Sequence, residues 1–124
     1  MAYLLVVDDD ADSRDVLTRF LTRAGHECAN APNGREALAS ILARTPDLIV
    51  LDLLMPEMDG TDLVEILRSY LRLQSLPIVV LTAAPDSPQA FRAKRQKVKA
   101  ILPKGKATFA EIHSVISDEL RSVA

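Results

Sequence analysis

Three carboxylates of this sequence directly follow short apolar runs. Asp8 and Asp9 come after Leu4-Leu-Val-Val7, and Asp52 comes after Leu48-Ile-Val-Leu51. Carboxylates brought close together repel one another and raise one another's pKa, so a cation is needed to keep them ionised. Oxygen ligands with open positions suit Mg²⁺, which keeps several waters and shares its shell with phosphate. These residue types indicate a divalent metal site, provided that the fold brings them together.

Two further polar residues stand at corresponding positions. Thr82 closes an apolar run at residues 77–81, and Lys104 follows another at residues 100–102. A hydroxyl and an ammonium group can both bind the oxygens of a phosphoryl group. Taken singly, these residues have ordinary roles: an aspartate after a strand usually caps a helix or forms a turn, as we expect of Asp10. Their joint placement after apolar runs favours a shared site.

Five apolar runs must position these side chains. Each is apolar on consecutive positions, which is typical of strands covered on both faces. The runs lie at residues 3–7, 26–29, 47–51, 77–81 and 100–102. Amphipathic helical patterns alternate with them, at residues 16–24 (ended by Gly25), 37–42, 63–71, 86–96 and 109–120.

Five strands alternating with five helices predict an α/β fold, an open parallel sheet with right-handed crossovers and helices on both faces. Ligands of such sheets bind beyond the carboxyl ends of the strands. The three carboxylates, Thr82 and Lys104 should therefore meet at one edge of the sheet.

Composition bounds the remaining possibilities. A chain of 124 residues, 48% of them hydrophobic, can bury one core, so we expect one domain. A net charge of -2 gives no excess of positive charge that would attract nucleic acid or an acidic membrane. The single cysteine, Cys28, suits a reducing cytosol, and no signal peptide or apolar run of about 20 residues is present. We expect a soluble, cytoplasmic protein.

The motifs resemble those of the receiver domain of two-component response regulators. The resemblance covers the whole chain and rests on Val6-Val-Asp-Asp9, on Asp52 with Met55-Pro-Glu-Met-Asp-Gly60, on Leu81-Thr-Ala83, and on Lys104, in that order. It implies a doubly wound, flavodoxin-like (βα)5 fold with strand order 2-1-3-4-5. Residues 1–124 would form a single receiver domain without an output domain.

The resemblance also implies a role for each site residue. Asp52 would accept a phosphoryl group from a histidine kinase or a histidine phosphotransfer protein. The ligands of Mg²⁺, or of Mn²⁺ in its place, would be Asp8, Asp9, Asp52 and the carbonyl of Leu54. The phosphoryl oxygens would be bound by Thr82, Lys104 and the backbone N–H of Ala83. The chain would then be a signalling switch that catalyses only its own phosphorylation and dephosphorylation, the latter slowly because Leu54 and Ala84 are apolar.

Two alternatives remain open at this point. The first is a phosphatase that uses Asp52 as a turnover nucleophile, although haloacid-dehalogenase-like enzymes would place a second acid where this chain has Leu54. The second is that this chain is the receiver segment of a larger regulator or hybrid kinase.

Partners are expected on the surface of the fourth helix, fifth strand and fifth helix. The segment Arg92-Ala-Lys-Arg-Gln-Lys-Val-Lys99 is basic, which suits either a solvated helix face or an acidic protein partner. Direct nucleic-acid binding is not expected, because no aromatic residue is interleaved with these charges. The chain should be a monomer or a phosphorylation-dependent dimer, without membrane contact.

Two positions depart from the family pattern. Most receivers carry Tyr or Phe three residues before the lysine and a proline after it, where this chain has Ile101 and Gly105. A cis bond costs about 2.5–4 kcal/mol when no proline follows, so the Lys104–Gly105 bond should be trans. Ile101 cannot replace a rotating aromatic ring, which predicts a muted or rerouted response on the fourth-helix and fifth-strand face.

Overall fold

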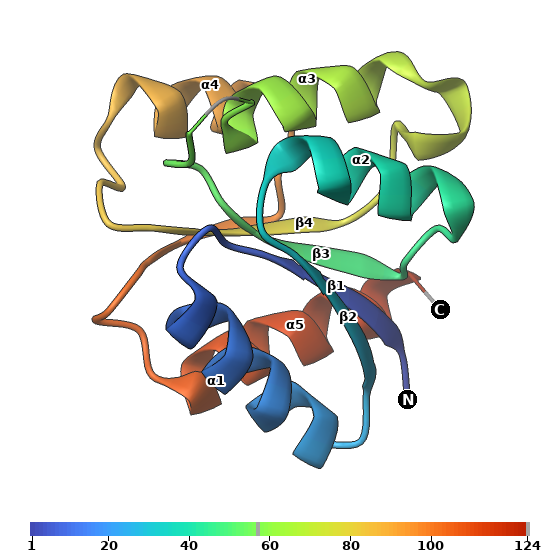
Figure 1. Ribbon diagram of the computed structural model, residues 1–124, viewed down its shortest axis with the longest axis vertical. Helices are drawn as coiled ribbons and strands as arrows, with labels where there is room; N and C mark the ends of the chain where they lie inside the picture. The colour runs from blue at the N-terminus through green and yellow to red at the C-terminus, as the bar shows by residue number, and fades with distance from the viewer. Residues whose placement is uncertain (57, 124) are drawn as a thin grey trace.

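Strands and helices alternate along the chain in the computed structural model, which describes residues 1–56 and 58–123 (Figure 1). The strands are β1 (Tyr3–Val7), β2 (Glu27–Ala31), β3 (Leu48–Asp52), β4 (Ile78–Thr82) and β5 (Ala100–Pro103). The α-helices are α1 (Ala11–Arg23), α2 (Gly34–Ala43), α3 (Gly60–Ser69), α4 (Pro88–Arg95) and α5 (Phe109–Val123). Glu57 of the quoted motif and Ala124 lie outside the described residues.

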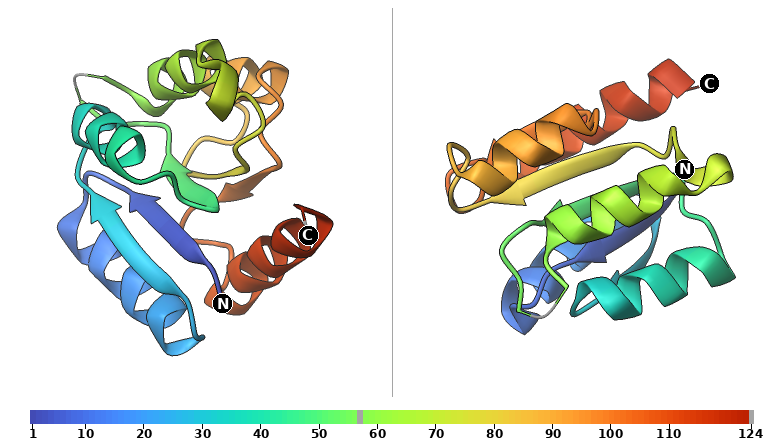
Figure 2. Two further views of the ribbon diagram at one scale, coloured as in Figure 1. Left: turned by 90° about the vertical axis from the view of Figure 1, so that its right-hand side faces the viewer. Right: turned by 90° about the horizontal axis from the view of Figure 1, so that it is seen from above.

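The five strands form one parallel sheet in the order β2-β1-β3-β4-β5, which confirms the predicted fold. Figure 2 shows α1 and α5 on one face and α2, α3 and α4 on the other. The register pairs Val7 with Leu51 and Asp52 with Leu81. The carboxyl ends of β1, β3 and β4 are therefore level, and the polar residues at those ends share one edge of the sheet.

Successive residues of a strand belong to two separate hydrophobic clusters, because their side chains point to opposite faces of the sheet. Leu5 and Ile49 belong to the cluster beneath α2, α3 and α4, whereas Leu4 and Leu48 belong to the cluster that includes residues of α1 and α5. All five residues of β3 and of β4 are buried. This double coverage explains why the strands read as continuous apolar runs.

Capping residues set several helix boundaries. Asp10 caps α1 as predicted, since its side chain accepts a hydrogen bond from the N–H of Asp12. Gly25, with φ of 103°, follows α1 in the left-handed conformation expected of a helix-ending glycine. The fourth helix is shorter than the predicted residues 86–96, because Ser87 caps it and Pro88 occupies its first turn.

Other boundaries also differ from the prediction. The second strand spans Glu27–Ala31 rather than residues 26–29, and the third and fourth strands begin and end one residue later than expected. The stripe at residues 63–71 is not one helix: α3 ends at Ser69, and a 3₁₀ helix, η1, covers Leu71–Leu73. No helix within the described residues is long and apolar enough to cross a membrane.

Candidate functional site

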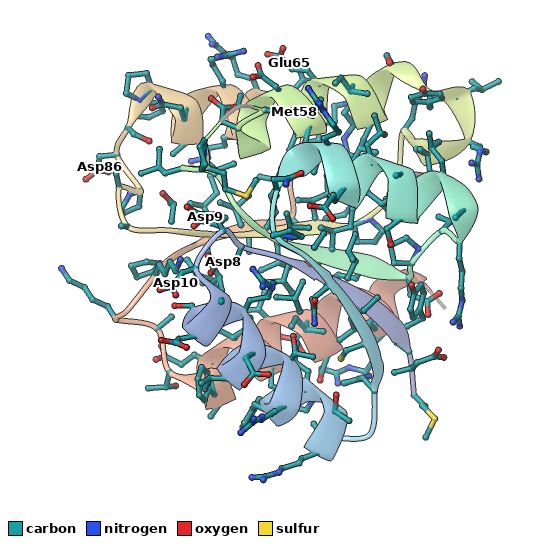
Figure 3. All side chains as sticks on the ribbon, viewed as in Figure 1. Asp8, Asp9, Asp10, Met58, Glu65 and Asp86 are labelled. Atoms are coloured by element: carbon teal, nitrogen blue, oxygen red, sulfur yellow. The ribbon has the colours of Figure 1, made fainter. Side chains whose placement is uncertain are left out.

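Three carboxylates converge where β1 and β3 end. Ligand oxygens of Asp8, Asp9 and Asp52 all lie within 4.8 Å of one another. Asp8 and Asp52 are each only 6% exposed, whereas Asp9 is exposed. Figure 3 shows Asp8 and Asp9 in the turn between β1 and α1. The predicted cluster is present, and its members differ in their access to solvent.

Lys104 bridges the two buried carboxylates. Its Nζ lies 2.8 Å from Oδ2 of Asp8 and 3.0 Å from Oδ2 of Asp52. Its backbone N–H donates to the carbonyl of Thr82 at 2.8 Å, which anchors the lysine beside β4. Partial burial opposes the charge on the lysine, but the hydrogen bonds to Asp8 and Asp52 prevail and raise its pKa. The ammonium is therefore the counter-charge of the cluster in this structure.

Burial dominates the electrostatics of Asp52. Desolvation raises the pKa of Asp52 above 3.8, and the hydrogen bond and charge of Lys104 offset this only in part, while the charge of Asp8 adds to the rise. The N–H of Leu54 donates to Oδ1 of Asp52 at 3.2 Å. One carboxylate oxygen thus faces the loop and the other faces the lysine.

Of the three remaining predicted residues, Thr82 ends β4, and Ala83 and Leu54 lie in the loops that follow β4 and β3. Thr82 is fully buried at the end of β4, where its Oγ1 accepts the N–H of Ala84 at 3.1 Å. Ala83 is exposed one residue beyond it, and Leu54 is 41% exposed. The hydroxyl proton of Thr82 takes no part in that bond.

Gly60 controls the path of the loop after Asp52, a role that the sequence reading did not assign. The N–H of Gly60 donates to the carbonyl of Leu53 at 2.8 Å. A Cβ at Gly60 would stand 2.6 Å from the carbonyl oxygen of Asp52 and 2.7 Å from Cα of Leu53. Only glycine permits this approach, and the signal was its place eight residues after Asp52, at the start of a helix.

Arg14 is a second residue that the sequence reading missed. Its Nη1 donates to the backbone carbonyl of Asp8 at 2.7 Å, and the N–H of Asp10 donates to Oδ1 of Asp8 at 2.9 Å. These bonds fix the turn that carries Asp9. An arginine one turn into a helix carries no sequence signal for such a contact.

The turn after β5 departs from the family pattern as predicted. The Lys104–Gly105 bond is trans, since no cis bond occurs among the described residues. Gly105 has φ of 85°, and the N–H groups of Lys106 and Ala107 donate to the carbonyl of Pro103. A tight turn with left-handed glycine therefore delivers the lysine to Asp8 and Asp52.

The donor set fits a hard divalent cation. All three side chains offer oxygen, the ligand type that Mg²⁺ prefers, and one oxygen of each lies within 4.8 Å of the others. The lysine already supplies a positive charge at two of the three carboxylates. The cluster is therefore a candidate site for a divalent metal.

Known bacterial regulators are similar to this chain in sequence. DNA-binding transcriptional regulator NtrC of Salmonella typhimurium is 40% identical over 99 residues, which cover 80% of this chain and 21% of the relative. Transcriptional regulatory protein AfsQ1 of Streptomyces coelicolor is 42% identical over 86 residues, covering 69% and 37%. The chain thus spans about a fifth of the length of the first relative and about two fifths of the second.

Solved structures show the same architecture. The signal receiver domain of a signal transduction histidine kinase from Syntrophus aciditrophicus superimposes with a TM-score of 0.90 at 28% identity, covering 99% of this chain and 92% of that one. Chemotaxis protein CheY4 of Vibrio cholerae gives 0.87 at 28% identity, covering 95% and 98%. The family model described as response regulator receiver domain matches residues 4–117, and this chain therefore belongs to the response regulator receiver domain family.

Proposed function

We propose that this chain is a phosphorylation-dependent signalling switch in which Asp52 accepts a phosphoryl group from a histidine kinase or a histidine phosphotransfer protein. The observation that supports it most is the convergence of Asp52, Asp8 and Lys104 at the carboxyl edge of the sheet. Family membership supports the same reading.

In the proposed reaction, a carboxylate oxygen of Asp52 attacks phosphorus in line with the leaving group. The bond from phosphorus to the donor nitrogen breaks, and the imidazole leaves with the electron pair. The Lys104 ammonium then moves from the carboxylates towards a phosphoryl oxygen. The Thr82 hydroxyl and the Ala83 N–H donate to the other oxygens, so each developing charge meets a donor.

Asp8, Asp9 and Asp52, with the carbonyl of Leu54, are the proposed ligands of Mg²⁺, and Mn²⁺ would serve with the same oxygen set. The metal, when bound, would neutralise charge on the carboxylates and on the phosphoryl oxygens. Asp8 and Asp9 hold their places through the turn that Arg14 and Asp10 stabilise. The protein would thus hold the ligand oxygens of Asp8 and Asp9 close together before the metal binds.

A groove beside the site is the proposed binding site for the phosphoryl donor protein. It has a volume of about 630 Å³ and runs from Asp8 and Lys104 between α1 and α5. Val16 and Phe109, both substantially exposed, contribute apolar surface to it. A donor helix lying on these residues could present its phosphohistidine to Asp52.

The proposed output surface includes α4 and β5. A groove of about 330 Å³ there is lined by apolar Phe91 and Ile101 and by Lys94 and Lys99. Phe91 is 59% exposed, and the last turn of α4 is basic. This combination suits an acidic protein surface with an apolar anchor. A second possibility is that this chain is the receiver segment of a larger regulator, and that the acidic partner surface belongs to another segment of the same protein. The greater length of the relatives favours this possibility.

Phosphorylation by acetyl phosphate tests the proposal. With Mg²⁺, the protein should gain one phosphoryl group that hydroxylamine removes, and Asp52→Asn should gain none. Asp86→Asn, a change at an exposed aspartate after β4 that Figure 3 labels, is the matched control and should label normally. Undiminished labelling of Asp52→Asn would refute the assignment. Steady hydrolysis of generic phosphomonoesters would instead favour the phosphatase alternative.

A further inference from the structure

The chain's two histidines, His26 and His113, lie against each other although 87 positions separate them. Their Nε2 atoms are 3.3 Å apart, and the ring centroids are 5.5 Å apart with the planes inclined by 58°. His26 stands just before β2, and His113 lies on α5. The pair therefore joins α5 to the amino end of β2, at the opposite end of that strand from the carboxylate edge.

A backbone contact fixes which nitrogen of His26 carries the proton. The N–H of Ala2 donates to Nδ1 of His26 at 3.2 Å, so this nitrogen must present a lone pair. A neutral imidazole with a bare Nδ1 carries its proton on Nε2. Nε2 of His26 is then the donor and Nε2 of His113 the acceptor, and the three groups form a directional chain from Ala2 to α5.

This chain of hydrogen bonds is complete only while both rings are neutral. A proton added to Nδ1 of His26 would face the N–H of Ala2, and that bond would be lost. A proton added to Nε2 of His113 would face the Nε2–H of His26, and the bond between the rings would be lost. Every way of adding one proton to these facing nitrogens therefore breaks one of the two bonds.

The surroundings also oppose a charge on the pair. Burial, the charge of His113 and the N-terminal amine lower the pKa of His26. The neighbouring acid on β2, Glu27, is already held by the guanidinium of Arg44 at 2.6 and 2.9 Å. On the α1 side, the rings of Phe20 and His113 are nearly perpendicular, with an interplanar angle of 79° and centroids 6.1 Å apart.

We propose that the His26–His113 pair is a proton-sensitive contact between α5 and the start of β2. The contact is closed when both rings are neutral, and the first proton that the pair takes up opens it. Opening would loosen α5 from the start of β2 without detaching the helix, because Ile112 and Ile116 stay buried in the core. If α5 belongs to the output surface of the proposed function, proton uptake would also change that surface.

The sign of the pH effect follows from the order of the pKa values. An unfolded histidine titrates near pH 6.5, and His26 in the folded protein titrates below that. Between the two values the unfolded chain binds more protons, so stability falls as pH decreases below about 6.5. The equilibrium constant for folding should fall about tenfold for each unit by which the pKa is lowered.

The test is a histidine NMR titration of the unphosphorylated protein, paired with urea unfolding between pH 5.5 and 7.5. The matched control is the double variant His26→Asn with His113→Gln. The Asn oxygen can still accept from Ala2, and the Gln amide can still reach position 26, but neither titrates. Wild type should lose stability across this range, and the double variant should lose less. The NMR shifts should include amides of residues 112–116 and 26–28.

Independent titration of both rings near pH 6.5 would overturn the proposal, as would equal pH dependence of wild type and double variant. If the double variant fails to fold, the single variant His113→Gln provides the same comparison, and unchanged pH dependence there is also a refutation. Because the measurements use no phosphorylation, the result is independent of the role proposed for Asp52.

Discussion

Lys104 places its ammonium 3.0 Å from Oδ2 of Asp52 and 2.8 Å from Oδ2 of Asp8, so one cation serves two buried carboxylates. A lysine on the turn after β5 thus bridges the ends of β1 and β3. This arrangement gives the two buried carboxylates a shared counter-charge. A metal bound by the cluster would therefore compete with the lysine for the same two carboxylates.

Replacing the lysine should expose this competition. Lys104→Met keeps the methylene packing and leaves two buried carboxylates without their shared partner, at a cost of about 1–3 kcal/mol in unfolding free energy. Millimolar Mg²⁺ should then raise the melting temperature of the variant more than that of wild type. Lys106→Met, at an exposed lysine of the same turn, is the control and should respond like wild type. An equal response of Lys104→Met and wild type would contradict the competition.

Asp52→Asn should be more stable than wild type at pH 7 in metal-free buffer. Because burial raises the pKa of Asp52 above 3.8, the folded protein binds this proton more readily than the unfolded chain. The contribution of Asp52 to stability is therefore lost as pH rises through its folded-state pKa. Urea unfolding should show an advantage for the variant that grows from pH 4 to pH 7. A variant less stable than wild type at pH 7 would show that the lysine outweighs burial.

Metal binding should stabilise the fold by mass action. A ligand at 100 times its Kd adds about 2.7 kcal/mol. Asp9→Asn removes the one exposed carboxylate of the cluster, so its unfolding free energy should change little without metal and gain less from Mg²⁺. Thermal unfolding with and without millimolar Mg²⁺ measures both quantities. A full metal response in Asp9→Asn would remove this residue from the ligand set.

The strand ends of the site could be read from the sequence because the relevant signals are local. An apolar run covered on both faces, followed by a carboxylate, placed β3 to within one residue and marked its carboxyl end. The break between α3 and η1 could not be read in this way. There Arg68 donates to the carbonyls of Leu73 and Leu76 and, through Nε, to that of Gln96. Contacts with partners up to 28 positions away leave no trace in a hydrophobic stripe.

Gly60→Ala should disturb the site as well as the fold. The new methyl group would meet the Asp52 carbonyl oxygen at 2.6 Å, which forces the loop to shift and costs about 1–3 kcal/mol. Gly25→Ala is the matched control: its φ of 103° strains any side chain, but nothing lies within 4 Å and the site is remote. Both variants should lose stability in urea unfolding. Only Gly60→Ala should also slow phosphorylation by acetyl phosphate, and an unchanged rate would argue against a positioning role.

Ile101 should limit how far the structural change caused by phosphorylation extends from the site. It pairs with Val80 in the sheet, lies half-buried against the core beneath α4, and lines the groove beside Phe91. Its β-branched side chain has few rotamers and cannot turn between solvent and core as an aromatic ring does. Movement of Thr82 towards a phosphoryl group must therefore be passed on by small repacking.

Amide NMR before and after phosphorylation measures this effect. In wild type, the shift changes should be concentrated in the loops around Asp52 and Thr82 and be small over residues 84–101. Ile101→Tyr, whose ring has space in the groove of about 330 Å³, should enlarge the changes over that range. Ile101→Val, which keeps the branched side chain, should behave like wild type. Changes over residues 84–101 as large in wild type as in Ile101→Tyr would show that the aliphatic side chain transmits the signal fully.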